Sequence, residues 1–317
     1  MTRGTKLLKY GLHAAVLLGV IWAGVKTLNG DEVQKALDNF NWWIAPLVCL
    51  LGLGSVLIKA WRFATLLKET KEIERSVAMK AYVAGQSMTL LPGGIAARSG
   101  LLEQVGVKVE ESSPAVALSS ITDQLAFILC GSIAAMWFEA ARKPVLIFLG
   151  FLALIGLLLG IEATRSWLIK MVDVIMGKFN WHEKWRGFVN GMSKTIDAKV
   201  IAVGVGNALM SFALLVGALY LCMRGVGESL PFMILLLAYT VPTMVGRISA
   251  MPGGFGLTEV GMVGVLDRMP GVRLDQAAAA VLVFRVGTVL FTALVGGILY
   301  YTGWRKVTDQ STPVVST

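Results

Sequence analysis

Five charged residues lie inside apolar stretches of this sequence: Arg98, Asp123, Arg247, Glu259 and Arg285. Ionisable side chains at membrane depth are costly, and by default they mark functional sites. Arginine presents forked N–H donors that suit phosphate oxygens, whereas the two carboxylates can hold a cationic amine or carry a proton. The combination predicts a polar site for an anionic headgroup within a membrane.

A Pro-Gly-Gly tripeptide occurs twice beside these charges. The copies are Pro92, Gly93 and Gly94, and Pro252, Gly253 and Gly254, so the two prolines are 160 residues apart. A helix broken at membrane depth leaves backbone groups that only protein or a wet cavity can satisfy, and paired breaks in two halves point to a transporter's binding site. Helices that begin after each copy would aim free N–H groups at the same region. We therefore add these six residues to the predicted substrate site.

Composition assigns the chain to the polytopic membrane proteins. Hydrophobic residues make up 56% and charged residues 15%, and the apolar residues come in blocks rather than at amphipathic spacing. Cys49, Cys130 and Cys222 all fall in apolar segments, and His13 and His182 are far apart. We therefore expect no disulfide, metal site or cofactor.

Six segments come near the length of about 20 residues that a crossing helix needs. They are Gly11–Leu28, Trp42–Leu67, Pro114–Phe138, Val145–Ile161, Val200–Met223 and Ala277–Gly303. Shorter apolar pieces flank the two Pro-Gly-Gly copies, and they predict two re-entrant hairpins. The piece Leu230–Ile248 is long enough to span alone, so a hairpin arm and a full span both stay open for it.

Loop charges predict the orientation. With a cytoplasmic N-terminus, six crossings and two hairpins, the inner face receives 19 Lys and Arg residues and the outer face six. Positive residues concentrate in cytoplasmic loops, so both termini are expected in the cytoplasm of a bacterial or archaeal cell. The two hairpins then open to opposite sides, as an inverted repeat requires.

The predicted fold is an all-α polytopic membrane protein with an inverted-topology repeat. The chain forms one membrane domain, 1–317, with a first repeat over 1–140, a second over 141–306 and a disordered tail over 307–317. The second repeat contains an insert, 162–199, which predicts amphipathic helices on the inner leaflet or, alternatively, a solvated connector.

Two sets of charged residues could have a structural role instead of contacting substrate. Asp123 and Arg285 are nearly equivalent under the repeat, so they could pair with each other and hold the halves in register instead of contacting substrate. Lys59 and Arg62 are expected to anchor the chain at the inner leaflet, or alternatively to form a basic approach path for lipid phosphates.

The motifs resemble a known family. The run Thr89–Gly94 followed by Arg98, the span containing Asp123, and the run Met251–Gly256 followed by Glu259 are similar to the membrane domain of bacterial lysylphosphatidylglycerol synthases and its stand-alone relatives. The resemblance implies lipid translocation, since in fused relatives this domain is associated with flipping aminoacylated phosphatidylglycerol while a soluble domain attaches the amino acid. Family members often carry Gly-Glu where this chain has Ala96-Ala97.

We therefore expect a lipid flippase that moves a phospholipid or polyprenyl-phosphate-linked headgroup between leaflets. The largest polar stretch is about 38 residues, so no aminoacyl-transferase domain and no enzymatic activity are expected. The alternatives are a membrane-embedded lipid-linked glycosyl or phosphoryl transferase, a secondary transporter for a small soluble anion, and a docking subunit. Expected partners are lipids with anionic or aminoacylated headgroups, with a lipid-modifying enzyme and a homodimer left open; nucleic acid is not expected.

Overall fold

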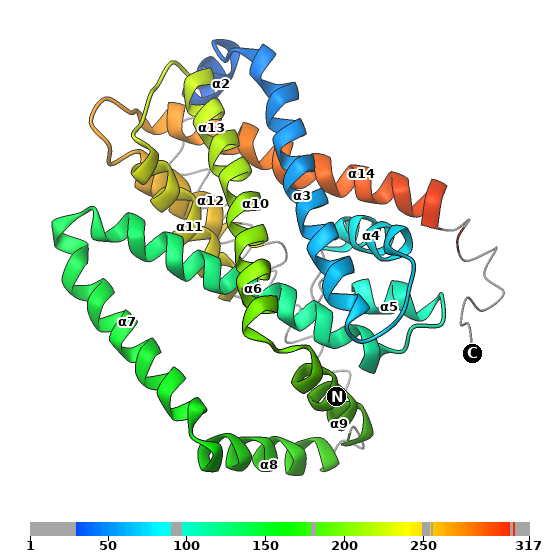
Figure 1. Cartoon of the computed structure of the whole chain (residues 1–317). Coiled ribbons are helices and arrows are strands. Elements are labelled where there is room, and N and C mark those ends of the chain that lie inside the picture. The colour runs from blue at the N-terminus through cyan, green and yellow to red at the C-terminus, as the bar shows by residue number, and fades with distance from the viewer. Residues whose placement is uncertain are drawn as a thin grey trace.

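The computed structural model describes residues 30–89, 97–178, 182–248, 254, 256–304 and 307. All the elements in these ranges are helical (Figure 1). In the first part of the chain they are α2 (Gly30–Asp38), η1 (Trp42–Ile44), α3 (Ala45–Lys68), α4 (Arg75–Ala84), η2 (Gly85–Met88), α5 (Ala97–Glu103), α6 (Val109–Met136), α7 (Glu139–Gly160), α8 (Glu162–Lys178) and α9 (His182–Thr195). They continue with α10 (Ala198–Gly225), α11 (Phe232–Ile248), α12 (Leu257–Leu266), α13 (Leu274–Arg285), η4 (Val286–Leu290), α14 (Phe291–Leu299) and η5 (Tyr300–Trp304).

Four helical stretches in the described part of the chain are long and apolar enough to cross a membrane. They are Trp42–Lys68, Val109–Met136, Ala198–Gly225 and Leu274–Trp304. Each matches a predicted span, so these four predictions are confirmed at the level of length and composition. The last stretch is continuous through α13, η4, α14 and η5, and its two η segments are π-helical turns.

The other two predicted spans are not confirmed by the described residues. Gly11–Leu28 lies outside the described residues. Helix α7 forms where the fourth span was predicted, but its apolar part, Val145–Leu158, is shorter than the four stretches above, so its crossing stays a prediction. The predicted hairpin pieces fold as the short helices α4, η2 and α5 and as α11 and α12.

Local signals explain where the long helices begin. Pro46 occupies the first turn of α3, where its missing N–H costs no hydrogen bond. The Glu111 carboxylate accepts from the Lys108 N–H at 3.0 Å at the start of α6, and the Asp197 carboxylate accepts from the Lys199 N–H at 3.2 Å at the start of α10. These caps satisfy N–H groups that the first helical turn leaves free.

Small residues allow the long helices to approach closely. A Cβ at Gly52 of α3 would lie 2.9 Å from the Gly287 carbonyl oxygen in the last stretch, and one at Gly204 of α10 would lie 2.7 Å from Thr122 Cγ2 in α6. Such contacts matter because lipid is as apolar as the side chains, so helix association depends on close packing. Each half therefore packs its first long helix against the second long helix of the other half.

The short helices also pack across the halves. A Cβ at Gly296 of α14 would lie 2.5 Å from the Val83 carbonyl oxygen in α4, and one at Gly131 of α6 would lie 3.4 Å from Thr240 Oγ1 in α11. Helix α11 packs along α12 as well, and Gly261 leaves the space that Pro242 fills.

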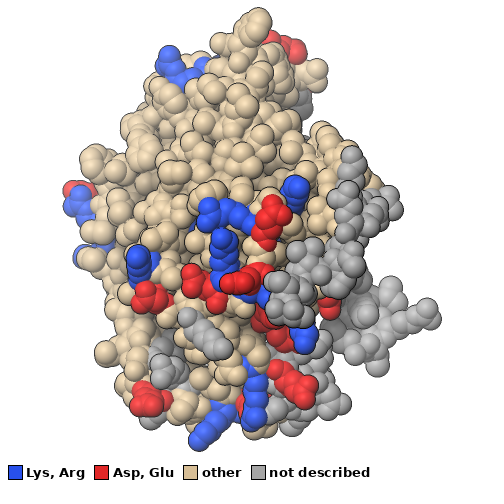
Figure 2. Space-filling view, turned by 45° about the vertical axis from the view of Figure 1, so that its right-hand side comes forward, with Lys and Arg blue, Asp and Glu red and all other residues tan. Residues whose placement is uncertain are grey.

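The described part of the predicted insert, 162–199, is mostly helical. Helices α8 and α9 occupy it, and α9 packs on the start of α6, where Gly191 leaves room for Pro114. Figure 1 shows α7 and α8 standing apart from the helices around α3 and α10. Figure 2 shows charged side chains from about the middle of its view downward and a few near the top, with an uncharged zone between the two groups. This separation fits a membrane-embedded middle.

Candidate functional site

Asp123 is the point at which four helices meet. Its Oδ1 lies 2.7 Å from Nη2 of Arg62, and its Oδ2 lies 3.6 Å from Nη1 of Arg247. Asp123 is contributed by α6, Arg62 by α3 and Arg247 by α11, and Arg62 also donates to the Gly204 carbonyl oxygen of α10 at 3.3 Å. A buried carboxylate is tolerated when it is paired and hydrogen-bonded in this way.

Arg62 is among the most buried polar side chains that the structure describes, with an exposed fraction of 2%. Besides Asp123 and Gly204, it donates to the Ser119 carbonyl oxygen at 3.2 Å. The expectation that Arg62 anchors the chain at the membrane surface is therefore wrong. The sequence did hold one signal, since the apolar run Phe63–Leu67 follows Arg62 and places it more than a helical turn inside the segment.

A second ion pair joins Glu259 of α12 to Arg285 of α13, between Oε1 and Nε. The other carboxylate oxygen of Glu259 accepts from the Gly256 N–H at 2.5 Å and so caps the start of α12. Gly256 has a φ of +91°, a value that glycine adopts without a Cβ penalty. Arg285 comes directly before the π-helical turn η4, a type of distortion that is frequent at functional sites.

Arg98 is held by neutral groups. Its guanidinium carbon lies 3.7 Å from the centre of the Tyr82 ring, and its Nη2 donates to Gln86 Oε1 at 2.8 Å. Arg98 is only 7% exposed. Its charge is thus positioned by cation–π attraction and a hydrogen bond and keeps its capacity to attract an anion.

Aromatic rings form one wall of the site. The Arg247 guanidinium lies 4.5 Å from the centre of the Phe127 ring, and Phe127 contacts Phe212 and Tyr239 with ring centres 4.2 and 5.8 Å apart. Lys59 lies 5.9 Å from the Phe212 ring centre. These rings surround the charges with apolar surface, which strengthens electrostatic interactions by keeping water away.

Positive charge exceeds negative charge around Asp123. Lys59 is within electrostatic range of Asp123 and of three arginines, which are Arg62, Arg98 and Arg247. Within the described ranges Asp123 is the carboxylate in contact with this group, because Glu259 is occupied by Arg285. Arginine stays protonated in proteins, so Arg62 and Arg247 together exceed the single charge of Asp123 by one, and Lys59 adds to this excess. The Arg62 side chain is buried, whereas that of Arg247 is 35% exposed.

Most of the predicted charged residues form ion pairs in the structure. Asp123 and Arg285 do not pair with each other as the structural alternative had proposed. Asp123 is paired with Arg62 and Arg247, and Arg285 with Glu259. Gly254 has a φ of +69° and packs against Gly246. The other predicted tripeptide residues, Pro92, Gly93, Gly94, Pro252 and Gly253, lie outside the described residues. Tyr82 and Gln86, which hold Arg98, were not among the predicted site residues. Neither belongs to a recognisable sequence motif.

Comparisons with known proteins agree with this architecture. The family model for the lysylphosphatidylglycerol synthase TM region matches residues 11–296. A protein of Methanothermobacter thermautotrophicus (strain ATCC 29096 / DSM 1053 / JCM 10044 / NBRC 100330 / Delta H), described as a UPF0104 membrane protein, is 32% identical over 143 residues. That match covers 43% of this chain and 40% of the archaeal protein.

Proposed function

Because this chain belongs to the family of the lysylphosphatidylglycerol synthase transmembrane region, we propose that it moves a lipid with an anionic headgroup between the two leaflets of its membrane. One observation carries the proposal: Arg62 and Arg247 share a single carboxylate, Asp123, while Lys59 and Arg98 add positive charge nearby. An uncompensated positive excess at membrane depth costs free energy, which a bound anion offsets. A phosphate offers the oxygens that arginine forks bind best.

The arrangement suggests how the headgroup is held. Asp123 lies 2.7 Å from Nη2 of Arg62 and 3.6 Å from Nη1 of Arg247, so its contact with Arg247 is the looser one. A phosphate entering the site would draw on Arg98 and Arg247 first, because neither is tightly paired with a carboxylate. The acyl chains would stay in the bilayer while the headgroup crosses between the helices.

We also propose that the fold is an inverted repeat with two re-entrant hairpins. The reciprocal contacts support this: Gly52 of the first half meets Gly287 of the second, and Gly204 of the second half meets Thr122 of the first. The short helices make the same kind of reciprocal contact: α4 of the first half packs on α14 of the second, and α11 of the second half packs on α6 of the first. Two structurally matched halves can alternate in opening to the two membrane faces.

The proposed setting is the cytoplasmic membrane of a bacterium or archaeon, with both termini in the cytoplasm and α8 and α9 at the inner leaflet. The family name suggests aminoacylated phosphatidylglycerol as one candidate lipid, and polyprenyl-phosphate lipids share the same phosphate chemistry. A lipid-modifying enzyme that supplies the substrate is a proposed partner.

The proposal is tested with purified protein in liposomes. Transbilayer movement of fluorescent phosphatidylglycerol, measured by quenching the outer-leaflet dye, should be faster than in protein-free liposomes. Arg98→Gln should slow it about tenfold or more, because one charge-assisted hydrogen bond contributes about 1.5–3 kcal/mol. The matched control is Arg268→Gln, which removes an exposed arginine between α12 and α13 and should leave the rate unchanged.

Two results would contradict the proposal. One is an unchanged rate for phosphatidylglycerol and for aminoacylated and polyprenyl-phosphate lipids. The other is uptake of a soluble anion without lipid movement, which would identify a secondary transporter. Covalent turnover of a lipid would instead identify a transferase.

A further inference from the structure

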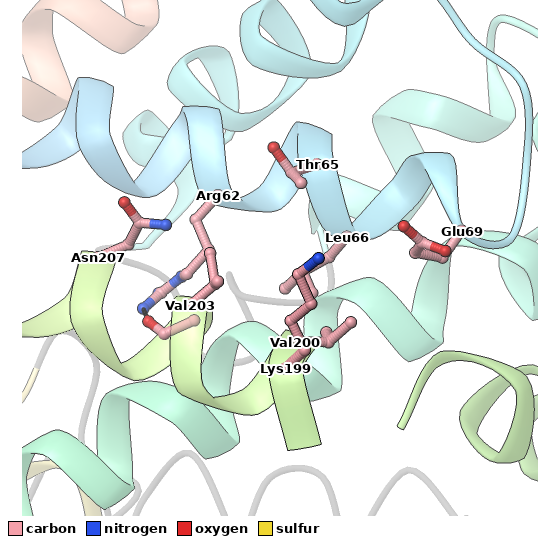
Figure 3. Close-up of a pocket in the computed structure, with 9 residues that line it drawn as sticks. Arg62, Thr65, Leu66, Glu69, Lys199, Val200, Val203 and Asn207 are labelled. Carbon is pink, nitrogen blue, oxygen red and sulfur yellow. Dashed lines mark hydrogen bonds between the residues drawn. The ribbon is translucent and has the colours of Figure 1, made fainter. Parts of the chain in front are cut away.

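A pocket of about 260 Å³ lies between the end of α3 and the start of α10 (Figure 3). Its lining residues are Arg62, Thr65, Leu66, Glu69, Lys199, Val200, Val203, Gly204 and Asn207. Figure 3 shows the Arg62 side chain reaching from α3 to the α10 ribbon, with Glu69 at the end of α3 and Lys199 at the start of α10. The pocket is not lined by Arg98, Glu259 or Arg285. It shares only Arg62 with the central group of charges, which consists of Lys59, Arg62, Asp123 and Arg247.

Arg62, which lines the pocket, has one hydrogen-bond donor without a partner. Two nitrogens of Arg62 are used by Asp123 and by the Ser119 and Gly204 carbonyl oxygens, whereas its Nε is buried and has no hydrogen-bond partner. A buried donor without an acceptor costs free energy. An anion in the pocket would supply that acceptor once a small rotation of the Arg62 guanidinium, which is 2% exposed, turns the buried Nε toward it.

The rim of the pocket lies at a boundary between apolar and charged surface. Val203 is 52% exposed, and Trp61, one turn from Thr65 on α3, is 47% exposed. Beyond them along the two helices, Glu69 and Lys199 are also exposed. Tryptophan next to basic residues is typical of the interface between hydrocarbon and headgroups. The pocket therefore opens where lipid phosphates lie rather than deep among the acyl chains.

We propose that this pocket is a loading site for a phospholipid headgroup, in which the phosphate binds Arg62 Nε and Lys199 while a hydroxyl or ammonium of the headgroup donates to Glu69. The inference rests on the proposed lipid transport and assigns it an inner-leaflet entrance. A volume near the lower end of ordinary ligand pockets, about 300–1,000 Å³, suits a headgroup and leaves the acyl chains against the apolar Val203 and Trp61. Glu69 favours a headgroup that carries a donor and disfavours a bare phosphate.

The loading site is coupled to the central charges through one side chain. Arg62 would hold the phosphate on one side and Asp123 on the other. A second anion on the same guanidinium weakens its attraction to Asp123. Arrival of a headgroup would thus loosen the contact that ties α3 to α6, at the step where the lipid has to pass between them.

Binding can be tested without any transport. Thr65→Cys places a thiol in the pocket, and its rate of alkylation by an uncharged, water-soluble maleimide reports occupancy in nanodiscs. The lipid arms are phosphatidylcholine alone and phosphatidylcholine with phosphatidylglycerol; a third arm adds soluble glycerol 3-phosphate to phosphatidylcholine nanodiscs. Phosphatidylglycerol should slow alkylation at least about fivefold, and glycerol 3-phosphate should not.

Matched variants make the result specific. Lys68→Cys, an exposed position that does not line the pocket, should react at the same rate in all arms. In the Thr65→Cys protein, Lys199→Ala should reduce the protection by phosphatidylglycerol to less than about twofold, and Glu69→Gln should reduce it as well. The unmodified chain gives the background from Cys49, Cys130 and Cys222.

Three outcomes show that the lipid headgroup does not load here: no protection by phosphatidylglycerol, equal slowing at Lys68→Cys, or full protection that survives Lys199→Ala. Protection by glycerol 3-phosphate equal to that by the lipid also overturns the loading site and assigns the pocket to a soluble anion. Protection that is intact in a protein without lipid movement would contradict the proposed transport while leaving the binding site in place, so the two failures are distinguishable.

Discussion

At the scale of single residues, the site is defined by how arginines are shared among too few carboxylates. Arg62 and Arg247 divide Asp123 between them, whereas Arg285 has Glu259 as its partner. Arg98 rests on Tyr82 and Gln86. The buried pair of Arg62 with Asp123 is a structural contact and a component of the proposed site at once, because it ties α3 to α6.

This dual role predicts coupling between Arg62 and Asp123. Arg62→Met should lower the free energy of unfolding by about 3 kcal/mol, because it leaves a buried carboxylate with only the more distant Arg247. Asp123→Asn should also destabilise. The double variant should lose about 1–3 kcal/mol less than the sum of the two single losses. The measurement is denaturant unfolding in detergent micelles; strictly additive losses would show that the pair does not interact in solution.

At the scale of helices, glycine decides which elements touch. Gly204 faces Thr122 of α6, whereas Gly206, two residues along the same helix, has nothing within 4 Å of where its Cβ would lie. Comparing the same substitution at Gly204 and at Gly206 therefore separates the loss of close packing from the general effect of replacing glycine in a membrane helix.

Gly204→Val should therefore destabilise the protein by about 1–3 kcal/mol, because the added methyl groups force α10 away from α6. Gly206→Val serves as the control and should change stability by less than about 0.5 kcal/mol. Thermal unfolding in micelles measures both. Equal losses for the two variants would mean that the contact between α10 and α6 is not closely packed.

At the scale of the whole molecule, the orientation of α11 and α12 decides between a hairpin and a further span. A hairpin returns Asp267, which follows α12, to the outer side, whereas a crossing α11 places it inside. Both Asp267 and Arg224 are exposed. If the N-terminus is cytoplasmic, as proposed, Arg224 at the end of α10 is expected outside in either case.

We expect Asp267→Cys and Arg224→Cys to react with a membrane-impermeant thiol reagent added to intact cells, and Glu183→Cys on α9 to react only after the membrane is opened. Labelling of Asp267→Cys from the inner side alone would establish α11 as a full span and would end the inverted-repeat proposal. The unmodified chain supplies the background of its native cysteines.

The sequence by itself determined the class of the protein, four of its long helices and five charged residues within apolar segments, but not the buried position of Arg62. Length, hydropathy and the cost of burying charge are local properties, so they can be read without the fold. The family followed from the same local motifs around Arg98, Asp123 and Glu259, and the family model confirms it over residues 11–296.

Only the tertiary structure decided which charges are partners. Arg62 stands near the end of an apolar segment, as an interfacial anchor would, and its burial arises because α6 and α10 cover it through the close approach at Gly204. The choice of Asp123 for Arg62 and Arg247, and of Glu259 for Arg285, depends on how α3, α6, α11, α12 and α13 cross. Those crossings bring together ion-pair partners that lie up to 124 positions apart, and no spacing along the chain encodes such a contact.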